Sequence, residues 1–289
     1  MESEAGKECS DVAMAGRIRM MKRQATMFYT LCRTERKRHM EIENLVKNLV
    51  LGLGADLCGI ANADAFAGAP EGFRPTDIFE PCRAVVVFAK SMPRGTACVA
   101  PRIVYNRAND VNTLEVDRMG LLAARALEDL NMTAVPLPAD SPYDYWDEER
   151  LEGRGILSMR HAAVLAGLGR FGKNTLVINE RFGNMITIGA ILVDRDLTTD
   201  SPAKDLCIVG CRRCLDACPQ NALGGASVIQ KRCRPHTYET NARGFGVVNC
   251  NVCRIVCPMR FGLGKHKAAH HFRMPSKKDS KTRNGGTFQ

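Results

Sequence analysis

The stretch Cys207-Ile-Val-Gly-Cys211-Arg-Arg-Cys214-Leu-Asp-Ala-Cys218-Pro219 is the most informative part of this 289-residue chain. A second run follows it, made of Cys233 and then Cys250-x2-Cys253-x3-Cys257-Pro258. Each run ends in Cys-Pro, and together they hold eight of the thirteen cysteines. Because one [4Fe–4S] cubane is bound by four thiolates, eight cysteines at this spacing predict two clusters. We therefore expect one-electron chemistry at low potential.

The spacing also predicts which cysteines bind which cluster. In two-cluster ferredoxins the last cysteine of each run binds the cluster of the other run. The predicted ligands are Cys207, Cys211, Cys214 and Cys257 for one cluster and Cys218, Cys233, Cys250 and Cys253 for the other. Three residues separate Cys207 from Cys211, which is one more than the usual two residues between the first two cysteines of such a run. Gly210 allows the loop to bulge so that Cys207 reaches its cluster.

Zinc binding and disulfide formation are the two other uses of cysteines at such spacing. Four-cysteine zinc sites also use C-x2-C pairs, but they show no preference for the C-x2-C-x3-C-P run. Disulfides need an oxidising compartment, and the sequence shows no secretory signal. No apolar run reaches the roughly 18–20 residues of a membrane span, so we expect a cytoplasmic protein without a membrane partner.

The net charge of +10 lies mainly at the two ends of the chain. Residues 1–40 carry nine Lys/Arg and five Asp/Glu, and residues 260–289 carry eight and one. The remaining body has 24 basic and 25 acidic residues, which gives it no basic excess for a large RNA. We therefore predict a flexible basic extension over 1–40, a disordered basic tail over 263–289, and no preference for tRNA.

Helix-like and strand-like segments alternate up to about residue 200, which indicates an α/β domain over 41–200. Apolar periodicity predicts helices over 41–53, from Thr113 to about 131, and over 158–166. Short apolar runs predict strands over 57–61, 84–89, 174–178 and 185–193. Loops around the clusters should dominate a second domain over 201–262. Cys58, Cys82 and Cys98 lack partners at ligand spacing and are expected to pack as small apolar groups, while Cys9 and Cys32 are expected to be free thiols.

The segment Gly167-Leu-Gly169-Arg-Phe-Gly172-Lys173 matches the letters of a dinucleotide fingerprint. A true fingerprint follows a strand and opens a helix, whereas this segment follows a predicted helix and precedes a predicted strand. We therefore expect a helix C-cap and a tight turn. The glycines would still let the backbone approach a flat group closely, with Lys173, Asn174 and Thr175 as neighbouring donors.

Several of these segments together resemble epoxyqueuosine reductase. They are His161-Ala-Ala-Val-Leu-Ala-Gly-Leu-Gly-Arg-Phe-Gly-Lys-Asn-Thr175, Ile188-Gly-Ala-Ile-Leu-Val-Asp194 and Cys211-Arg-Arg-Cys-Leu-Asp-Ala-Cys-Pro219, with the closing C-x2-C-x3-C-P run. That family, like the related reductive dehalogenases, carries a cobalamin beside two [4Fe–4S] clusters. The resemblance implies an α+β fold, with a nitroreductase-like α/β sandwich followed by a ferredoxin-like two-cluster domain.

The resemblance also implies a mechanism and a set of site residues. Electrons from a ferredoxin or flavodoxin would pass through the clusters to the corrinoid, which would reduce a small-molecule or unknown substrate. The residues implied to line the corrin are Gly167, Gly169, Gly172, Lys173, Asn174 and Thr175. His161 is expected to be an ordinary helix histidine, since these relatives bind cobalamin without a histidine below the ring.

The family's proposed proton donor is an aspartate, and the corresponding position here is Gly153. A reductive site needs a proton source, and Glu152, Tyr145 and Tyr143 are the nearby candidates. Two rival hypotheses remain. The chain could be a ferredoxin-like carrier that reduces the cofactor of a redox partner protein, or a zinc-containing nucleic-acid binder.

Overall fold

The computed structural model describes residues 41–99, 102–225, 227–240, 243–248 and 250–264. The chain divides into two compact units between Val46 and Lys47. The described part of the first unit, residues 41–46, is helical, and residues 47–52 at the start of the second unit are helical as well. The predicted extension over 1–40, with Cys9 and Cys32, lies outside the described residues, as does the predicted tail from Lys265 onward.

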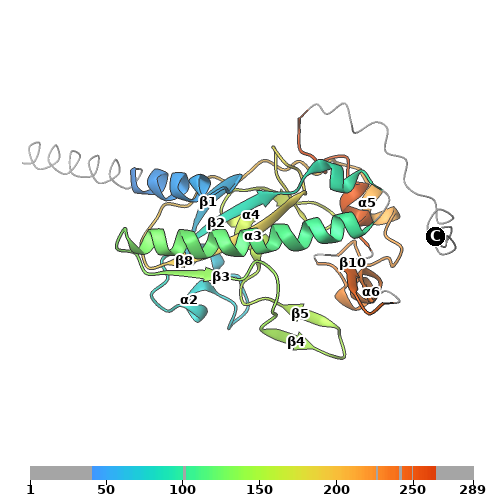
Figure 1. Ribbon diagram of the computed structural model, residues 1–289, viewed down its shortest axis with the longest axis horizontal. Coiled ribbons are helices and arrows are strands. Elements are labelled where there is room, and N and C mark those ends of the chain that lie inside the picture. The colour runs from blue at the N-terminus through green and yellow to red at the C-terminus, as the bar shows by residue number, and fades with distance from the viewer. Residues whose placement is uncertain (1–40, 100–101, 226, 241–242, 249, 265–289) are drawn as a thin grey trace, which may run out of the picture. The chain divides into compact units, whose positions relative to one another are not determined.

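The second unit contains a four-stranded sheet in the order β1-β2-β8-β3 (Figure 1). Its strands are β1 (Leu57–Asn62), β2 (Ala84–Ser91), β8 (Ile186–Val193) and β3 (Ala134–Leu137), and every neighbouring pair is antiparallel. β2 and β8 are the central strands, and they pair over their full length from Ala84↔Val193 to Ser91↔Ile186. Their continuous burial explains why both sequences are apolar without alternation.

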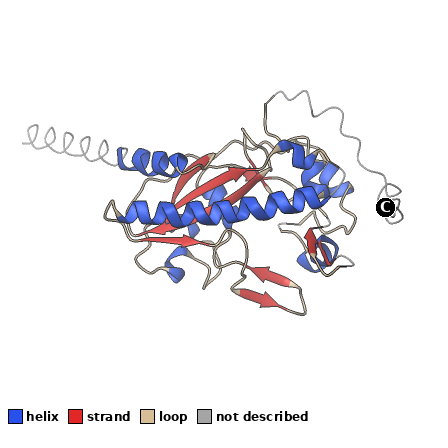
Figure 2. Cartoon of the chain, in the orientation of Figure 1, coloured by secondary structure: helices blue, strands red, loops and turns tan. Residues whose placement is uncertain are grey.

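The two faces of this sheet are covered by different helices (Figure 2). Helix α3 (Arg102–Glu128) packs on the face that carries Phe88, and helix α4 (Met159–Leu165) packs on the face that carries Val85 and Val87. Gly189 lies opposite Phe88 in the ladder, and a Cβ there would come within 2.6 Å of the Phe88 ring. The missing side chain therefore makes room for this ring beneath α3.

The remaining elements are short. They are η1 (Ala63–Phe66), α2 (Pro75–Ile78), η2 (Arg94–Ala97), β4 (Tyr145–Asp147), β5 (Glu152–Arg154), β6 (Arg170–Phe171), β7 (Val177–Ile178), α5 (Arg213–Asp216), α6 (Gln230–Thr237), β9 (Tyr238–Thr240), β10 (Gly246–Val248) and α7 (Val252–Ile255). The strands β4 and β5, β6 and β7, and β9 and β10 form three separate antiparallel pairs. Loops and short helices hold all eight cysteines of the two runs, as expected from the sequence.

The mixed helix–strand fold and the positions of β1, β2, β8 and α4 confirm the sequence predictions. The predicted start of the long helix was wrong, since the chain is already helical at Arg102. Thr113 does not cap this helix because its hydroxyl donates to the carbonyl of Asn109 in the preceding turn. The strand predicted over 174–178 is limited to β7, because Thr175 adopts a left-handed conformation with φ of 62°. β3 and the β4–β5 hairpin were not predicted.

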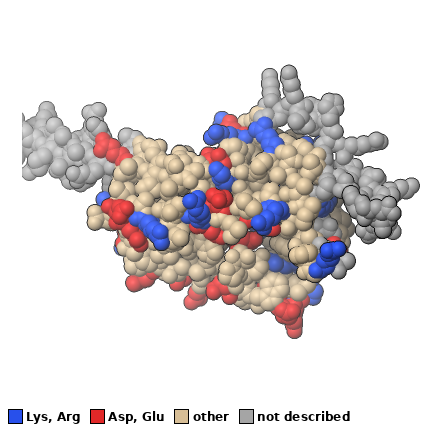
Figure 3. All heavy atoms as spheres, in the orientation of Figure 1, with Lys and Arg blue, Asp and Glu red and all other residues tan. Residues whose placement is uncertain are grey.

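Charged side chains of both signs are interspersed over the visible face of the described residues (Figure 3). Among the described residues, no helix combines the length and the hydropathy that crossing a membrane requires.

Candidate iron–sulfur site

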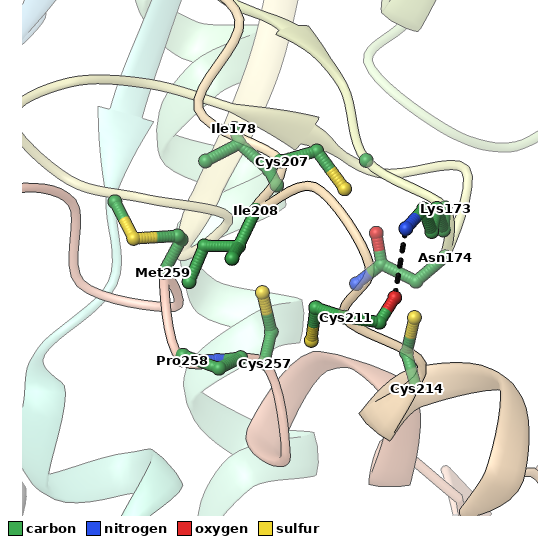
Figure 4. Close-up of a pocket in the computed structure, with 11 residues that line it drawn as sticks. Lys173, Asn174, Ile178, Cys207, Ile208, Cys211, Cys214, Cys257, Pro258 and Met259 are labelled. Carbon is green, nitrogen blue, oxygen red and sulfur yellow. Dashed lines mark hydrogen bonds between the residues drawn. The ribbon is translucent and has the colours of Figure 1, made fainter.

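The first predicted set of cysteines surrounds one hollow (Figure 4). Cys207, Cys211 and Cys214 reach it from the loop and the short helix α5, and Cys257 reaches it from the segment after α7. The other lining residues are Gly172, Lys173, Asn174, Ile178, Ile208, Pro258 and Met259. The four thiols thus share an enclosure with a largely apolar wall, which is the environment a buried cluster requires.

The longer first gap does not keep Cys207 away from this hollow. Gly210 has φ of 74° and no neighbour within 4 Å of an added Cβ, so the loop turns there in a conformation that suits glycine. The amide of Cys211 donates to the carbonyl of Ile208, which closes the turn. Within this loop Val209 is 97% exposed. The added length therefore projects into solvent as a bulge.

The second predicted set of cysteines is also brought together. Burial raises the pKa of the Cys253 thiol to about 11, and Cys250, Cys233 and Cys218 raise it further through their negative charge. Burial likewise raises the pKa of Cys250, with the charges of Cys233 and Cys218 adding to the effect. The four sulfurs therefore lie within electrostatic range of one another.

The first set shows the same pattern among its own members. Burial raises the pKa of Cys257 to about 11, and Cys214, Cys207 and Cys211 add to that shift. Cys257 lines the same hollow as Cys207, Cys211 and Cys214, so the structure places it beside the cysteines of the first run. The assignment of the eight cysteines to two clusters stays a prediction from the spacing.

The thiols with raised pKa values are protonated near neutral pH, so binding iron must release their protons. Among the described residues, no three His, Cys, Asp or Glu side chains converge on one point as the ligands of a single ion do. A cubane is bound differently, because each of its four irons takes one thiolate. Its ligands need to surround a hollow rather than converge on one point, and the first set of cysteines does so.

The three glycines of the predicted turn are required by packing within the chain. α4 ends with the C-cap residue Ala166, and Gly167 follows with φ of 72°, as expected for a helix C-cap. Added Cβ atoms would come within 2.4 Å of the Ser201 carbonyl at Gly167 and within 2.6 Å of the Ile178 carbonyl at Gly169. At Gly172 an added Cβ would come within 2.7 Å of Asn174 and Ile178. The close approach expected for a flat ligand is therefore made to the protein itself.

The three polar residues after these glycines fasten the turn to its surroundings. The ammonium of Lys173 donates to the carbonyl of Cys211 at 2.8 Å (Figure 4), and the amide of Asn174 donates to the carbonyl of Cys253 at 3.0 Å. Asn174 is only 2% exposed. The hydroxyl and carbonyl of Thr175 both accept from Arg160. One turn therefore bonds to the backbone of one cysteine from each predicted set.

No model of a protein family matches the chain, but curated epoxyqueuosine reductases do. The protein from Lactococcus garvieae is 32% identical over 116 residues, which cover 36% of this chain and 32% of that protein. The protein from Staphylococcus aureus is 28% identical over 247 residues, which cover 73% of this chain and 62% of that protein. An epoxyqueuosine reductase solved with an epoxyqueuosine-modified tRNA stem loop superposes with a TM-score of 0.52 at 18% identity, covering 80% of this chain and 69% of that chain.

The chain is similar to epoxyqueuosine reductases in sequence over part of its length, and it shares their fold. It spans between about a third and three fifths of the length of these curated relatives.

The structure gives a physical reason for glycine at position 153, where the resemblance implies an aspartate. A Cβ on Gly153 would lie 2.9 Å from the guanidinium of Arg234 and 2.9 Å from the Tyr143 ring. The backbone of Gly153 is also held from both sides by Gln230, which accepts from its N–H and donates to its carbonyl, each at 3.1 Å. The space of an acidic side chain is therefore taken by Arg234.

The three proton-donor candidates lie in two different environments. Glu152 and Tyr145 both interact with Arg154, which binds the Glu152 carboxylate at 2.9 Å and lies 5.1 Å from the centre of the Tyr145 ring. Tyr143 instead stacks on Trp146 at 6.3 Å and lies beneath Arg234. The structure therefore separates Tyr143 from the other two candidates.

His161 and the isolated cysteines make their contacts within the protein. His161 shares a hydrogen bond with the Ser158 hydroxyl and contacts the Phe171 ring edge-on at 4.9 Å. Burial lowers its pKa, and the positive charge of Arg160 lowers it further. Cys82 is buried in the core, and Cys58 and Cys98 are partly buried.

Sequence reasoning missed the contacts of the Arg234 guanidinium with the rings of Tyr143 and Tyr238. Tyr143 precedes β4 and Arg234 lies in α6, so no spacing in the sequence connects these two residues.

Proposed function

We propose that this chain is an iron–sulfur oxidoreductase that passes single electrons through two [4Fe–4S] clusters to a corrinoid. The observation that carries the proposal is the hollow lined by Cys207, Cys211, Cys214 and Cys257, which brings the last cysteine of the second run to the first run. Clusters at these sites would supply one-electron reduction. A ferredoxin-like domain over 201–262 would hold them, and a nitroreductase-like domain over 41–200 would hold the corrinoid and substrate.

The cysteines and their surroundings suit the clusters. Lys173 and Asn174 bond to backbone carbonyls in the two cysteine loops, so they position ligands without competing for iron. The corrinoid is supported by the family relationship. Since the glycines of the turn pack against the protein, the exposed backbone and side chains beside the turn would contact the ring, rather than the glycine Cα positions themselves.

The substrate that the family relationship favours is epoxyqueuosine in tRNA. The curated relatives are named for it, and one relative was solved with a modified tRNA stem loop. The sequence had disfavoured tRNA because the body of the chain has no basic excess. A stem loop can nevertheless be bound by a small local cluster of cations, and a single-stranded loop also offers bases for stacking. A ferredoxin or flavodoxin would supply the electrons.

Metal and corrinoid analysis of protein prepared without oxygen tests the proposal. We expect about eight iron and eight sulfide per chain, together with uptake of cobalamin in a base-off form. A chain that takes up clusters but no corrinoid would be an electron carrier for a partner protein. Stoichiometric zinc in place of iron would refute the electron-transfer role.

The crossed arrangement has a sharper test in the variants Cys257→Ser and Cys98→Ser. Loss of Cys257 should remove about four of the eight irons and leave Cys211 and Cys214 open to alkylation, while Cys250 and Cys253 stay protected. If each run instead binds its own cluster, Cys250 and Cys253 become the reactive pair. Cys98 lies outside both sets, so its variant should keep the full iron content.

A further inference from the structure

Two cations from distant parts of the chain are each bonded to a loop that carries predicted cluster ligands. Arg102, the first residue of α3, donates to the side-chain carbonyl of Asn251, which directly follows Cys250. Lys173, at the end of the glycine turn, donates to the backbone carbonyl of Cys211 at 2.8 Å (Figure 4). Each predicted ligand set therefore has one cation fixed to its backbone or to a neighbouring side chain.

The contact of Arg102 is made to a buried residue. Asn251 is the N-cap residue of α7, and its own carbonyl accepts from two amides of that helix. Arg102 is itself partly buried. A second bond holds α3 against the same region, because the side chain of Asn106 accepts from the Val248 amide at 2.7 Å. The guanidinium of Arg102 is therefore kept in a fixed place beside the second cysteine set.

The contact of Lys173 is made at the hollow of the first cysteine set. Lys173 lines this hollow together with Cys207, Cys211, Cys214 and Cys257. Its side chain is exposed, and its Nζ is directed to the Cys211 carbonyl (Figure 4). The charge of Lys173 therefore lies beside the first cysteine set but remains open to solvent.

Neither cation is neutralised by an acidic neighbour. Within the part of the chain that the structure describes, no Asp or Glu carboxylate lies within 4.0 Å of the charged nitrogens of Arg102 or Lys173. A reduced [4Fe–4S] cluster carries one more negative charge than the oxidised cluster. An unpaired positive charge beside it therefore favours the reduced form.

We propose that Arg102 and Lys173 raise the reduction potentials of the two clusters, Arg102 that of the cluster held by the second cysteine set and Lys173 that of the first. This rests on the function proposed above, since both clusters must bind. Each cluster accepts one electron from the donor, and a higher potential makes that transfer more favourable. Solvent screens the exposed charge of Lys173 more strongly than the partly buried charge of Arg102, so Arg102 has the larger effect.

The test is a redox titration with dithionite of full-length protein that carries both clusters and no corrinoid. Electron paramagnetic resonance follows the signals of the two reduced clusters. Arg102→Gln and Lys173→Gln each keep an N–H donor and remove the charge. We expect Arg102→Gln to disfavour reduction of one cluster tenfold, which lowers its potential by about 59 mV. Lys173→Gln should disfavour reduction of the other cluster about threefold, which lowers its potential by about 28 mV.

Four further variants serve as controls. Arg102→Lys and Lys173→Arg keep the charge and should titrate like the parent protein. Lys90→Gln removes a lysine that also donates to a backbone carbonyl, that of Gly54, but lies in neither cysteine loop. Arg118→Gln removes a charge from an exposed position of the same helix as Arg102. These last two variants should leave both potentials unchanged.

The proposal is overturned if either glutamine variant leaves both potentials unchanged, or if both variants shift the same signal. Iron content is measured for every variant. If Arg102→Gln loses its cluster, Lys173→Gln decides, because an exposed side chain can be shortened without opening a buried gap. A parent protein without any iron–sulfur signal would refute the function proposed above and this proposal with it. Failure of corrinoid uptake would count only against that function, since the titration needs neither corrinoid nor turnover.

Discussion

Replacing Gly183 by alanine should detach a cysteine loop from the α/β part of the chain. Gly183 has φ of 61°, and an added Cβ would lie 2.2 Å from the Met259 carbonyl oxygen and 2.2 Å from the Arg260 carbonyl carbon. The same two segments also approach each other at Gly262, where an added Cβ would lie 2.2 Å from the Glu180 carbonyl oxygen. Two backbone segments are therefore in direct contact, and neither can move aside as a flexible side chain could.

The expected cost has two parts. A left-handed conformation costs a residue with a Cβ about 1–2 kcal/mol, and forcing extra atoms into a packed contact costs about 1–3 kcal/mol. Gly183→Ala should therefore lower the free energy of unfolding by about 2–5 kcal/mol. Gly72→Ala is the matched control, because Gly72 has φ of 82° but no neighbour within 4 Å of an added Cβ. Gly72→Ala should therefore show only the cost of the left-handed conformation, about 1–2 kcal/mol.

Guanidinium unfolding followed by circular dichroism, under argon, measures both variants. Iron release to a chelator is followed in parallel, because Cys257 lies two residues before Met259 and its cluster should be lost first from the Gly183 variant. Equal destabilisation by the two substitutions would refute the reasoning, since it would mean that the contact with Met259 and Arg260 contributes nothing beyond backbone strain.

Three further predictions concern side chains away from this contact. Asn174→Ala should lower stability by about 1–3 kcal/mol, because it leaves the Cys253 carbonyl without its partner; an unchanged unfolding midpoint would contradict this. His161 has a pKa lowered by burial and by Arg160, so its protonation favours the unfolded chain and stability falls as pH drops below about 6.5. His161→Gln should remove that part of the slope, and thermal midpoints between pH 5 and 8 would show whether it does. Burial raises the pKa of Cys58 to about 12 and that of Cys82 to about 11, so iodoacetamide at pH 8 should label them only after unfolding, as mass spectrometry can verify.

Local sequence patterns predicted the parts of the fold that depend on nearby residues. The central strand β2 contains a run of β-branched residues, and Gly167 directly follows the C-cap of α4, so both elements could be located from the sequence alone. The start of α3 could not, because Thr113 resembles a cap and only the structure shows its hydroxyl bonded within the helix. The β4–β5 hairpin was missed because its exposed residues carry no hydrophobic alternation.

The candidate site likewise has a part that depends on nearby residues and a part that depends on tertiary contacts. The spacing of the cysteines predicted both ligand sets, since a cubane requires four thiolates and two tight runs can supply them only in a few ways. The glycine turn shows what spacing alone cannot predict. The sequence indicates that glycine is needed at Gly169, but only the structure shows that the group close to it is the Ile178 carbonyl and not a ligand.

The sequence by itself determined which cysteines are candidate cluster ligands, because ligand type and spacing are properties of short stretches of chain. Only the tertiary structure decided what lies beside those cysteines. Arg234 occupies the space next to Gly153, and Lys173 bonds to the Cys211 carbonyl, through contacts between segments that are far apart in the sequence. Such contacts depend on how the whole chain packs, and no local pattern of residues records them.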